Sequence, residues 1–277
     1  MNGLSQLSPP NHADERSPLI SIITVVYNRE KTLRRAVESV VGQTCDSFEY
    51  VVIDGASTDG SMEILNQYED RIDVLVSEPD KGMYYALNKG IERATGEFIG
   101  IVHSDDFLVD ENVLSSVAKQ MREHDADIFH GDALSLTHVG ERAETTKLSS
   151  THANILQTAM SMVHPASFIR RSIFRKIGGY DTEFRSAADY EFFVRCVKSG
   201  LEFLHIDTTV CCIDSNPDGR VSNNCFAHLE AYRFHKRHQT GNHRKYLLSY
   251  LNCRMRSFVH KFVSPEQRSK LRGLIKK

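Results

Sequence analysis

The sequence contains no hydrophobic run long enough to cross a membrane and no apolar leader at its start. The longest apolar run, LISIITVVY at 19–27, includes Ser and Thr. A membrane-spanning helix needs about 20 apolar residues, so this run indicates a buried strand instead. Residues 1–17 are polar and contain Pro, without the basic start and apolar segment of a signal peptide. We therefore expect a disordered lead over 1–17 and a cytoplasmic protein.

The sequence also lacks cysteine pairs with a recognisable spacing. Its six cysteines are scattered, with no Cys-x-x-Cys pair and no zinc-type pattern. We expect them to be reduced thiols, some of them buried. His235 and His238 lie about one helical turn apart, but no third metal ligand accompanies them. A solvated helix face is the expectation for this pair.

Glycine-rich phosphate fingerprints are absent as well. Gly55 and Gly60 match neither G-x-G-x-x-G nor G-x-x-x-x-G-K-[ST], and Lys81-Gly82 does not complete such a motif. The first predicted strand is not followed by D-x-D-x-[TV]. These absences argue against a dinucleotide-binding, P-loop or phosphatase site.

Negative charge is almost missing from the C-terminal end. Residues 231–277 hold 13 Lys+Arg and 1 Asp+Glu, a net charge of +12, whereas residues 1–230 carry a net charge of −14. We expect a helical basic tail over 223–277. Within 243–263, one helical stripe carries Leu247, Leu251, Met255, Phe258 and Phe262.

Two interpretations of the tail remain open. The stripe can pack on the body, or residues 243–277 can bind an anionic membrane surface, where each Lys or Arg contributes about 1 kcal/mol. We expect no nucleic-acid partner, because the acidic body would repel a polyanion.

What the first half of the chain does contain is a repeated alternation of strand and helix. Apolar runs at 20–27, 50–54, 72–78 and 97–102 predict strands, and helical periodicity follows them. This order predicts an α/β fold in which helices cover both faces of a mostly parallel sheet.

The alternation ends near residue 125. A hairpin around Val139-Gly140, helices over 172–178 and 189–200, and a strand over 202–206 predict an α+β extension. The polar segment 140–153 suggests a mobile lid. No internal repeat demands a second domain, so we expect one domain over 18–222.

Polar residues stand where the predicted strands end. These are Tyr27-Asn28, Asp54-Gly55, Glu78 with Asp80, and Asp105-Asp106. Ligands of open parallel sheets bind at this edge, and an acidic edge accepts phosphates through a divalent cation such as Mg²⁺ or Mn²⁺. Each piece alone also fits a turn or a helix cap.

Five segments in a fixed order carry a family resemblance. They are TVVYN at 24–28, DGASTDGS at 54–61, EPDKGMYYALNKGI at 78–91, ATGEFIGIVHSDD at 94–106 and GGYDTEFRSAADYEFFVR at 178–195. Over about residues 19–215 the chain resembles family 2 glycosyltransferases with a GT-A fold. The resemblance implies inverting transfer of a sugar from a nucleotide-diphosphate sugar to an acceptor hydroxyl. It also implies a role in polysaccharide or lipopolysaccharide assembly on a lipid-linked acceptor.

The resemblance also implies roles for individual residues. Tyr27 and Asp54 would hold the nucleotide base, Asp106 would bind Mn²⁺ or Mg²⁺, and Asp189 would be the catalytic base. Further donor contacts are expected from Thr24, Asn28, Lys81, Asn88 and Asp105. We expect His164 on the acceptor side.

The chain departs from the family pattern at four positions. Ser104 replaces the first aspartate of the metal-binding signature, Ala188 replaces the glutamate before the catalytic aspartate, and Tyr85 stands where an acidic residue is common. His103 also stands in place of a small polar residue, and we expect it to be structural. For Asp189 the alternative role is a helix N-cap.

Two other functional classes need consideration. A nucleotidyltransferase would have a glycine-rich loop after the first strand, but TVVYNREKT contains no glycine. A non-catalytic nucleotide-sugar-binding module would not need Asp106 and Asp189, and both are present.

Overall fold

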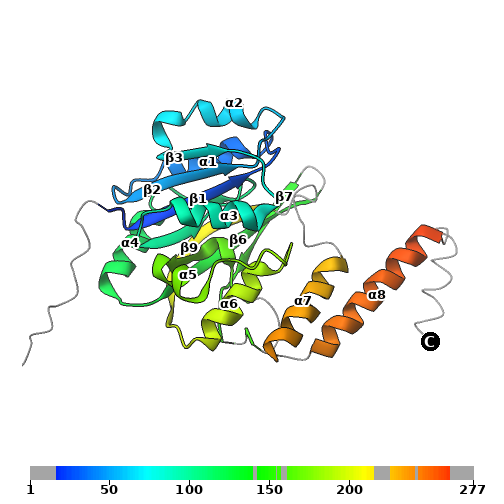
Figure 1. The fold of residues 1–277 in the computed structure, drawn as a ribbon. Coiled ribbons are helices and arrows are strands. Elements are labelled where there is room, and N and C mark those ends of the chain that lie inside the picture. The colour runs from blue at the N-terminus through cyan, green and yellow to red at the C-terminus, as the bar shows by residue number, and fades with distance from the viewer. Residues whose placement is uncertain are drawn as a thin grey trace, which may run out of the picture.

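The computed structural model describes residues 17–139, 142–153, 155–156, 161–214, 225–240 and 243–262. These residues build a nine-stranded sheet with helices on both of its faces (Figure 1). The strands are β1 (Ile20–Val26), β2 (Phe48–Asp54), β3 (Val74–Ser77), β4 (Phe98–Ile101), β5 (Phe107–Leu108), β6 (Ile128–Val139), β7 (Arg142–Leu148), β8 (Ser167–Arg170) and β9 (Phe203–Asp214). The α-helices are α1 (Leu33–Val41), α2 (Ser61–Asn66), α3 (Met83–Arg93), α4 (Val113–Glu123), α5 (Arg171–Ile177), α6 (Ala188–Lys198), α7 (Cys225–His238) and α8 (His243–Phe262). Two 3₁₀ turns, η1 (Glu69–Arg71) and η2 (His164–Ala166), complete the elements.

The strand order is β3-β2-β1-β4-β8-β6-β9-β5, with β7 paired to β6. Strands β1 to β4 pair in parallel, and Val26 at the end of β1 lies opposite Asp54 at the end of β2. β8 then runs antiparallel between β4 and β6. The predicted α/β class with a parallel N-terminal half is confirmed. The parallel register brings the carboxyl ends of the strands to one edge.

Burial on both faces explains the continuous hydrophobic runs of the sequence. In β1, Ile22 belongs to the core on one face and Ile23 to the core on the other, and both are fully buried. A strand covered by helices on both sides has no solvated face, so its apolar residues do not alternate with polar ones.

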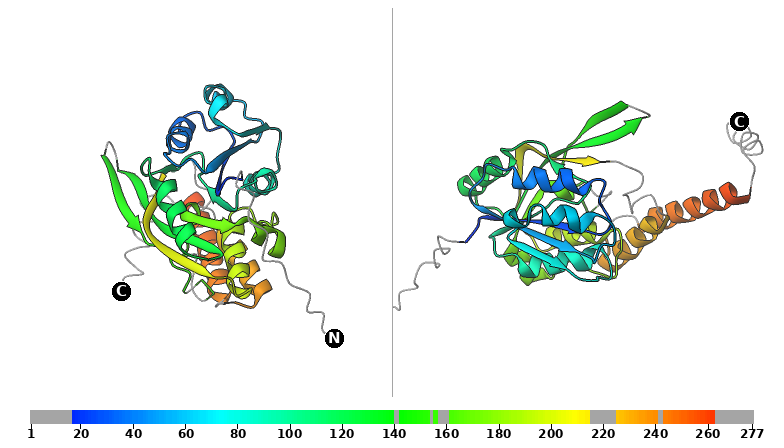
Figure 2. Two further views of the ribbon diagram at one scale, coloured as in Figure 1. Left: turned by 90° about the vertical axis from the view of Figure 1, so that its left-hand side faces the viewer. Right: turned by 90° about the horizontal axis from the view of Figure 1, so that it is seen from above.

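The hairpin expected around Val139-Gly140 is present as β6 and β7, which pair from Ala133↔Leu148 to Val139↔Arg142 (Figure 2). The prediction of a mobile lid over 140–153 is not supported at residues 142–148, because these residues form strand β7. Its sequence is polar because β7 pairs with a neighbour on only one side and the side chains from 143 to 147 are exposed, not because the segment lacks structure.

Helix α7 packs on the body through α6. Phe234 is fully buried, and its ring centroid lies 4.6 Å from that of Tyr190. The solvated face expected for His235 and His238 is wrong. His235 is fully buried and stacks on Tyr246 of α8 at 4.6 Å, and His238 Nε2 lies 2.8 Å from Glu191 Oε1. The reason is that α7 has neighbours on two sides, α6 and α8.

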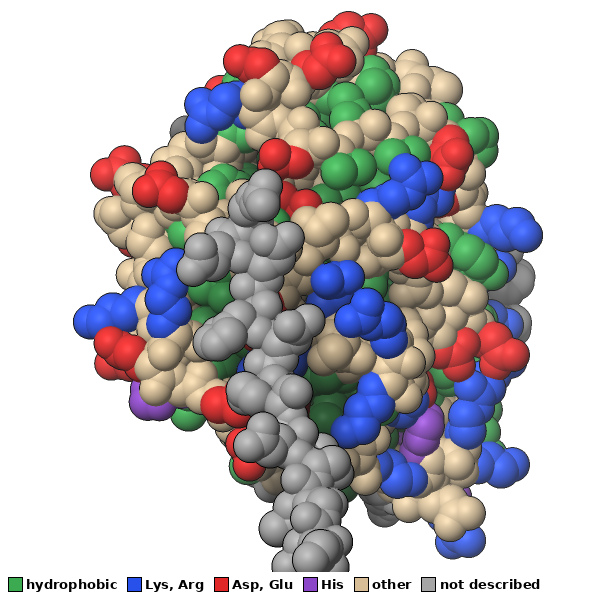
Figure 3. Space-filling model, turned by 60° about the vertical axis from the view of Figure 1, so that its left-hand side comes forward, with side chains coloured by type: hydrophobic (Ala, Val, Ile, Leu, Met, Phe, Trp, Pro, Cys, Tyr) green, Lys and Arg blue, Asp and Glu red, His purple; other side chains and the backbone are tan. Residues whose placement is uncertain are grey.

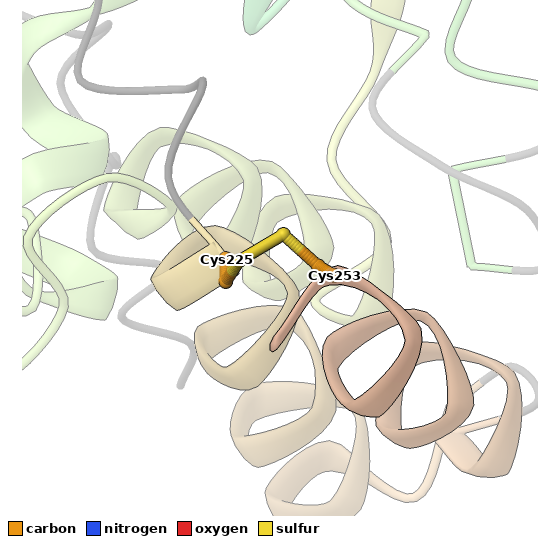
Figure 4. The surroundings of a disulfide bond; sticks show 2 residues. All are labelled: Cys225 and Cys253. Atoms are coloured by element: carbon orange, nitrogen blue, oxygen red, sulfur yellow. A yellow bond between two sulfur atoms is a disulfide. The ribbon is translucent and has the colours of Figure 1, made fainter. Parts of the chain in front are cut away.

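A disulfide joins Cys225 at the start of α7 to Cys253 in α8 (Figure 4). The expectation of reduced thiols is therefore wrong for these two cysteines. Cys45, Cys196, Cys211 and Cys212 are free. The sequence separation is 28 residues, and a cross-link of that length stabilises a fold by about 3.6 kcal/mol in the chain-entropy description.

The expected lead over 1–17 lies almost wholly outside the described residues, and so does the expected domain boundary after 222. Among the described residues, no helix combines the length and the apolar composition that crossing a membrane requires. Acidic and basic side chains are interspersed on the face of the molecule seen in Figure 3.

Candidate active site

The rim at the end of β1 carries Tyr27, whose side chain is 61% exposed. Asn28 follows in the left-handed region with φ 53°, a conformation that Asn tolerates better than most residues. Its Oδ1 accepts the Thr58 N–H at 2.8 Å, and its own N–H donates to Ser57 Oγ at 2.9 Å. These bonds tie the loop after β2 to the end of β1 and leave the Tyr27 ring open to a ligand.

Asp54 ends β2 and is fully buried. Its carboxylate accepts three hydrogen bonds, from Ser57 N (3.0 Å), Ser57 Oγ (2.5 Å) and Ser77 Oγ (2.6 Å). A carboxylate offers about four lone-pair sites, so one remains for a base N–H. Asp54 thus organises the rim, and its contact with a nucleotide base stays a prediction.

Gly55 brings Tyr27 and Asp80 together. A Cβ at this position would lie 2.8 Å from Asp80 Oδ2 and 3.3 Å from Tyr27 Cδ2. The backbone of Gly55 therefore forms the floor between an aromatic ring and a carboxylate.

Replacing Gly55 with Ala should weaken nucleotide-sugar binding by roughly 10-fold, the effect of losing about 1.4 kcal/mol of interaction free energy. The added methyl displaces Asp80 and Tyr27, whereas the strand beneath them is untouched. Titration calorimetry with the donor measures the loss. Gly60→Ala is the matched control, because its Cβ meets only Glu30, and donor affinity should not change. Equal affinities in both variants would contradict this site.

The turn after β4 carries Asp105 and Asp106. Asp106 is 4% exposed, its N–H donates to His103 O at 3.0 Å, and its Oδ1 accepts the Asp214 N–H at 3.3 Å. Arg35 of α1 donates from Nη2 to Asp105 O at 3.2 Å and to Asp214 Oδ2 at 2.7 Å. The turn is thereby fastened to α1 and to the end of β9.

The charge of Asp214 depends on the same contacts. Burial alone would raise the pKa of this carboxyl, but Arg35 and His138 outweigh it and hold the pKa below its usual value. Asp214 is therefore ionised and pairs with Arg35.

The oxygens of Asp105 and Asp106 suit Mg²⁺ or Mn²⁺ by their chemistry. Among the residues placed in the structure, no group of three or more His, Cys, Asp or Glu is arranged to hold a metal ion. Mg²⁺ commonly uses only one or two protein carboxylates, with waters and substrate phosphates completing the shell. The donor set therefore fits a cation that arrives with a nucleotide.

Asp189 lies in the first turn of α6. Ala187 occupies the N-cap position, so the cap role considered for Asp189 is not the one the helix shows. The Tyr84 hydroxyl of α3 donates to Asp189 Oδ1 at 3.0 Å. Burial raises the pKa of Asp189, while hydrogen bonds, including that from Tyr84, and the nearby His103 oppose the rise. The result is a positioned carboxylate with increased basicity.

Two histidines connect Asp189 with the Asp105-Asp106 turn. His103 interacts electrostatically with both Asp105 and Asp189, and its ring centroid lies 5.8 Å from that of His164. His164 is buried, and its Nε2 lies 2.8 Å from the Tyr180 hydroxyl. Burial first, and His103 second, lower the pKa of His164 to about 3, so this ring is neutral near pH 7.

The structure thus places His103 beside His164 and within electrostatic range of Asp105 and Asp189, and we call these four residues the cluster. Sequence reasoning missed Tyr84 and Tyr180, which touch this cluster from α3 and from the segment before α6. Tyr84 lies in the motif segment 78–91 and Tyr180 in the segment 178–195, but the spacing of residues within these segments did not predict the contacts.

Other residues expected to bind the donor are held by the protein itself. Thr24 is fully buried, and its Oγ1 accepts from the Tyr50 hydroxyl at 3.0 Å. Asn88 bonds Tyr180 at both amide ends, to O at 2.8 Å and from N at 2.9 Å. Lys81 is exposed just before α3. The polar groups of Thr24 and Asn88 are thus bonded within the protein. Direct donor contacts by Thr24, Asn88 and Lys81 remain predictions.

Tyr84→Phe should lower kcat by roughly 10-fold and move the acid limb of the pH profile to higher pH. The hydroxyl stabilises the ionised form of Asp189, so its removal raises the pKa of the carboxyl further, and the base is deprotonated only at higher pH. A pH–rate profile measures both effects. Tyr85→Phe on the exposed side of α3 is the control and should leave the limb in place. An unmoved limb in Tyr84→Phe would rule out this coupling.

Comparison with known proteins gives a consistent result. The sequence model described as Glycosyl transferase family 2 matches residues 21–178. The chain is 31% identical over 187 residues to a "PGL/p-HBAD biosynthesis glycosyltransferase" of Mycobacterium bovis, which covers 65% of this chain and 70% of that relative.

Solved structures support the fold. S. aureus TarS in complex with UDP-GlcNAc superposes with a TM-score of 0.62 at 20% identity, over 90% of this chain and 77% of that chain. In a second TarS structure, solved with UDP, the match spans 61% of that chain at a TM-score of 0.58. A mannosyltransferase of Pyrobaculum calidifontis, in complex with GDP-Man and Mn²⁺, gives 0.64 at 17% identity, over 95% of this chain and 81% of that chain.

Proposed function

Because the chain belongs to glycosyl transferase family 2, we propose that it transfers a sugar from a nucleotide-diphosphate donor to an acceptor hydroxyl, with inversion at the anomeric carbon. The observation that carries this proposal is the buried Asp189 carboxylate, held by the Tyr84 hydroxyl at 3.0 Å, with His103 of the Asp105-Asp106 turn near enough to influence its charge. One carboxylate group faces the leaving diphosphate and another is held for the attacking hydroxyl.

The donor end is proposed at the rim formed by Tyr27, Asp54 and Gly55. An exposed tyrosine ring offers a stacking face for the base, and Asp54 offers its remaining lone pair. UDP, UDP-GlcNAc and GDP-Man in the structural relatives support a nucleotide-sugar donor. A bound Mn²⁺ or Mg²⁺ held chiefly by Asp106 would neutralise charge on the departing nucleoside diphosphate. The Mn²⁺ in the mannosyltransferase structure supports that cofactor.

Asp189 is proposed to accept the proton of the acceptor hydroxyl. A general base must be ionised at the working pH and basic enough to take the proton, and burial provides the second property. The Tyr84 hydroxyl and the Tyr190 N–H both bond the carboxylate, and of its roughly four lone-pair sites at least one remains for the acceptor. The family's glutamate before this aspartate is Ala188 here, which leaves Asp189 as the carboxylate of that pair.

A lipid-linked acceptor in glycoconjugate or polysaccharide assembly is the acceptor class we propose, at the cytoplasmic side of a membrane. The relative from M. bovis carries a glycoconjugate biosynthesis description, which supports this class. His164 lies in the cluster beside His103 and Tyr180, from where it orders the acceptor side.

The proposal is tested by incubating the full chain with Mn²⁺ and a panel of UDP-, GDP- and dTDP-sugars. Slow release of nucleoside diphosphate from one donor is expected, because water can replace the acceptor. Formation of pyrophosphate from nucleoside triphosphate and sugar phosphate would point to a nucleotidyltransferase instead. Donor binding with no turnover, even with added acceptor extracts, would point to a binding module.

A further inference from the structure

Five large hydrophobic side chains are exposed among the described residues. Tyr27 follows β1 and Tyr85 lies on α3, whereas Leu248, Leu251 and Met255 lie together on α8, where they are 61%, 51% and 60% exposed. The three α8 residues are spaced i, i+3, i+7 and therefore form one stripe along the helix, which we call the α8 stripe. Leu247, also expected in this stripe, is half-buried. The side chains of Phe258 and Phe262 lie outside those the structure describes.

The opposite face of α8 makes the contacts with the rest of the protein. Tyr246 stacks on His235 of α7, and Cys253 is bonded to Cys225. At about 100° per residue, Tyr246 and Cys253 point roughly opposite to Leu251. Figures 1 and 2 show α8 extending from α7 away from the sheet. The helix is thus fastened by one face and presents its apolar stripe outward.

The charge of α8 indicates which partner suits this stripe. The sequence of α8 contains no Asp or Glu, and Arg244 and Arg254 beside the stripe are exposed. A second copy of α8 would bring the same positive charge and be repelled. An anionic lipid surface accepts both features, because apolar side chains enter the acyl boundary while Arg and Lys meet the phosphates.

We propose that the α8 stripe binds an anionic lipid surface, with α8 lying in the plane of the interface and α7 holding it at the body. This interaction does not require sugar transfer, so the two proposals are tested separately. A chain without activity can still bind vesicles, and an active chain can fail to bind them.

The test is co-sedimentation of the full chain with vesicles of phosphatidylcholine alone or with phosphatidylglycerol, at low and high salt. We expect binding to the anionic vesicles and its loss as salt shortens the Debye length from about 10 Å. The triple variant Leu248→Ser, Leu251→Ser, Met255→Ser should lose roughly 10- to 100-fold in affinity, since it removes the apolar part of the contact. Because these side chains are exposed, circular dichroism should show an unchanged fold.

Charge is tested with a matched pair of double variants. Arg244→Gln with Arg254→Gln should weaken binding roughly 30-fold, from about 1 kcal/mol for each charge. Lys119→Gln with Arg122→Gln removes the same charge from exposed positions of α4 and should not weaken it. Three results would overturn the proposal: no binding of the full chain to anionic vesicles, equal binding by the stripe variant, or equal losses in the two charge variants. A dimer in light scattering that the stripe variant abolishes would also overturn it, in favour of a second copy.

Discussion

Replacing Asp189 with Asn should slow sugar transfer by roughly 10²- to 10⁴-fold, the usual contribution of a positioned proton acceptor. Asn keeps the size of the side chain and can still accept the Tyr84 hydroxyl hydrogen through its amide oxygen. It cannot take a proton from the acceptor hydroxyl. Donor affinity, measured by calorimetry, should remain within a few-fold of the parent chain because Asp189 is proposed to act on the acceptor and not on the donor.

The stability of the same variant gives an independent control. Since burial raises the pKa of Asp189, the charged carboxylate is less favourable in the folded than in the unfolded chain. The stabilising contribution of this group is therefore present below its usual pKa and is lost as pH rises through the raised pKa. At neutral pH, Asp189→Asn should keep or raise Tm. A normal transfer rate with normal donor binding would show that Asp189 is not the base.

Replacing Asp106 with Ala should reduce transfer by at least roughly 10³-fold, the upper part of the range for loss of one electrostatic stabiliser of the transition state. The variant should also lose the part of donor binding that depends on Mn²⁺. Asp105→Ala should weaken donor binding less, because its carboxylate is expected to contact the nucleoside rather than to hold the cation. Calorimetry with and without Mn²⁺ separates these two effects.

Asp106→Ala also removes the acceptor for the Asp214 N–H. A merely structural role would lower Tm and weaken donor binding equally with and without the cation. Asp106→Asn, which retains an oxygen for that N–H, is therefore the second variant to measure. Full, metal-independent turnover in either variant would contradict the assignment of the cation to Asp106.

The N-terminal half of the fold was predictable because its signals are local. A strand buried on both faces is apolar over most of its length, and the runs at 20–27 and 50–54 are apolar apart from Ser21, Thr24 and Asp54. Parallel pairing then places the strand ends together, so the positions of Tyr27, Asp54 and Asp106 at one edge followed from chain order and resemblance.

The contacts that complete the site were not predictable from local patterns. Tyr84 and Asp189 are 105 residues apart. Helical periodicity predicts that the Tyr84 side chain points into the core, but it does not predict which residue that side chain contacts. The Cys225–Cys253 bond likewise depends on how α8 folds back on α7.

The direction in which the α8 stripe faces could not be predicted from local patterns either. Periodicity identified an apolar face of α8 but did not show which way it pointed. The outward direction follows from Tyr246 and Cys253 on the other side of the helix. The buried His235 was missed because two helices cover α7, and the sequence of α7 alone does not reveal the second.

The anomeric configuration of the sugar that the chain releases distinguishes inverting from retaining displacement on a nucleotide sugar. Proton NMR should follow hydrolysis of an α-linked donor selected from the panel, with Mg²⁺ and the parent chain, and with Asp189→Asn as the matched control. Inverting displacement predicts that the first sugar formed is the β anomer, and the proposed role of Asp189 predicts that its appearance slows in Asp189→Asn. An α anomer formed first would contradict inversion, and an equal rate in Asp189→Asn would contradict that role.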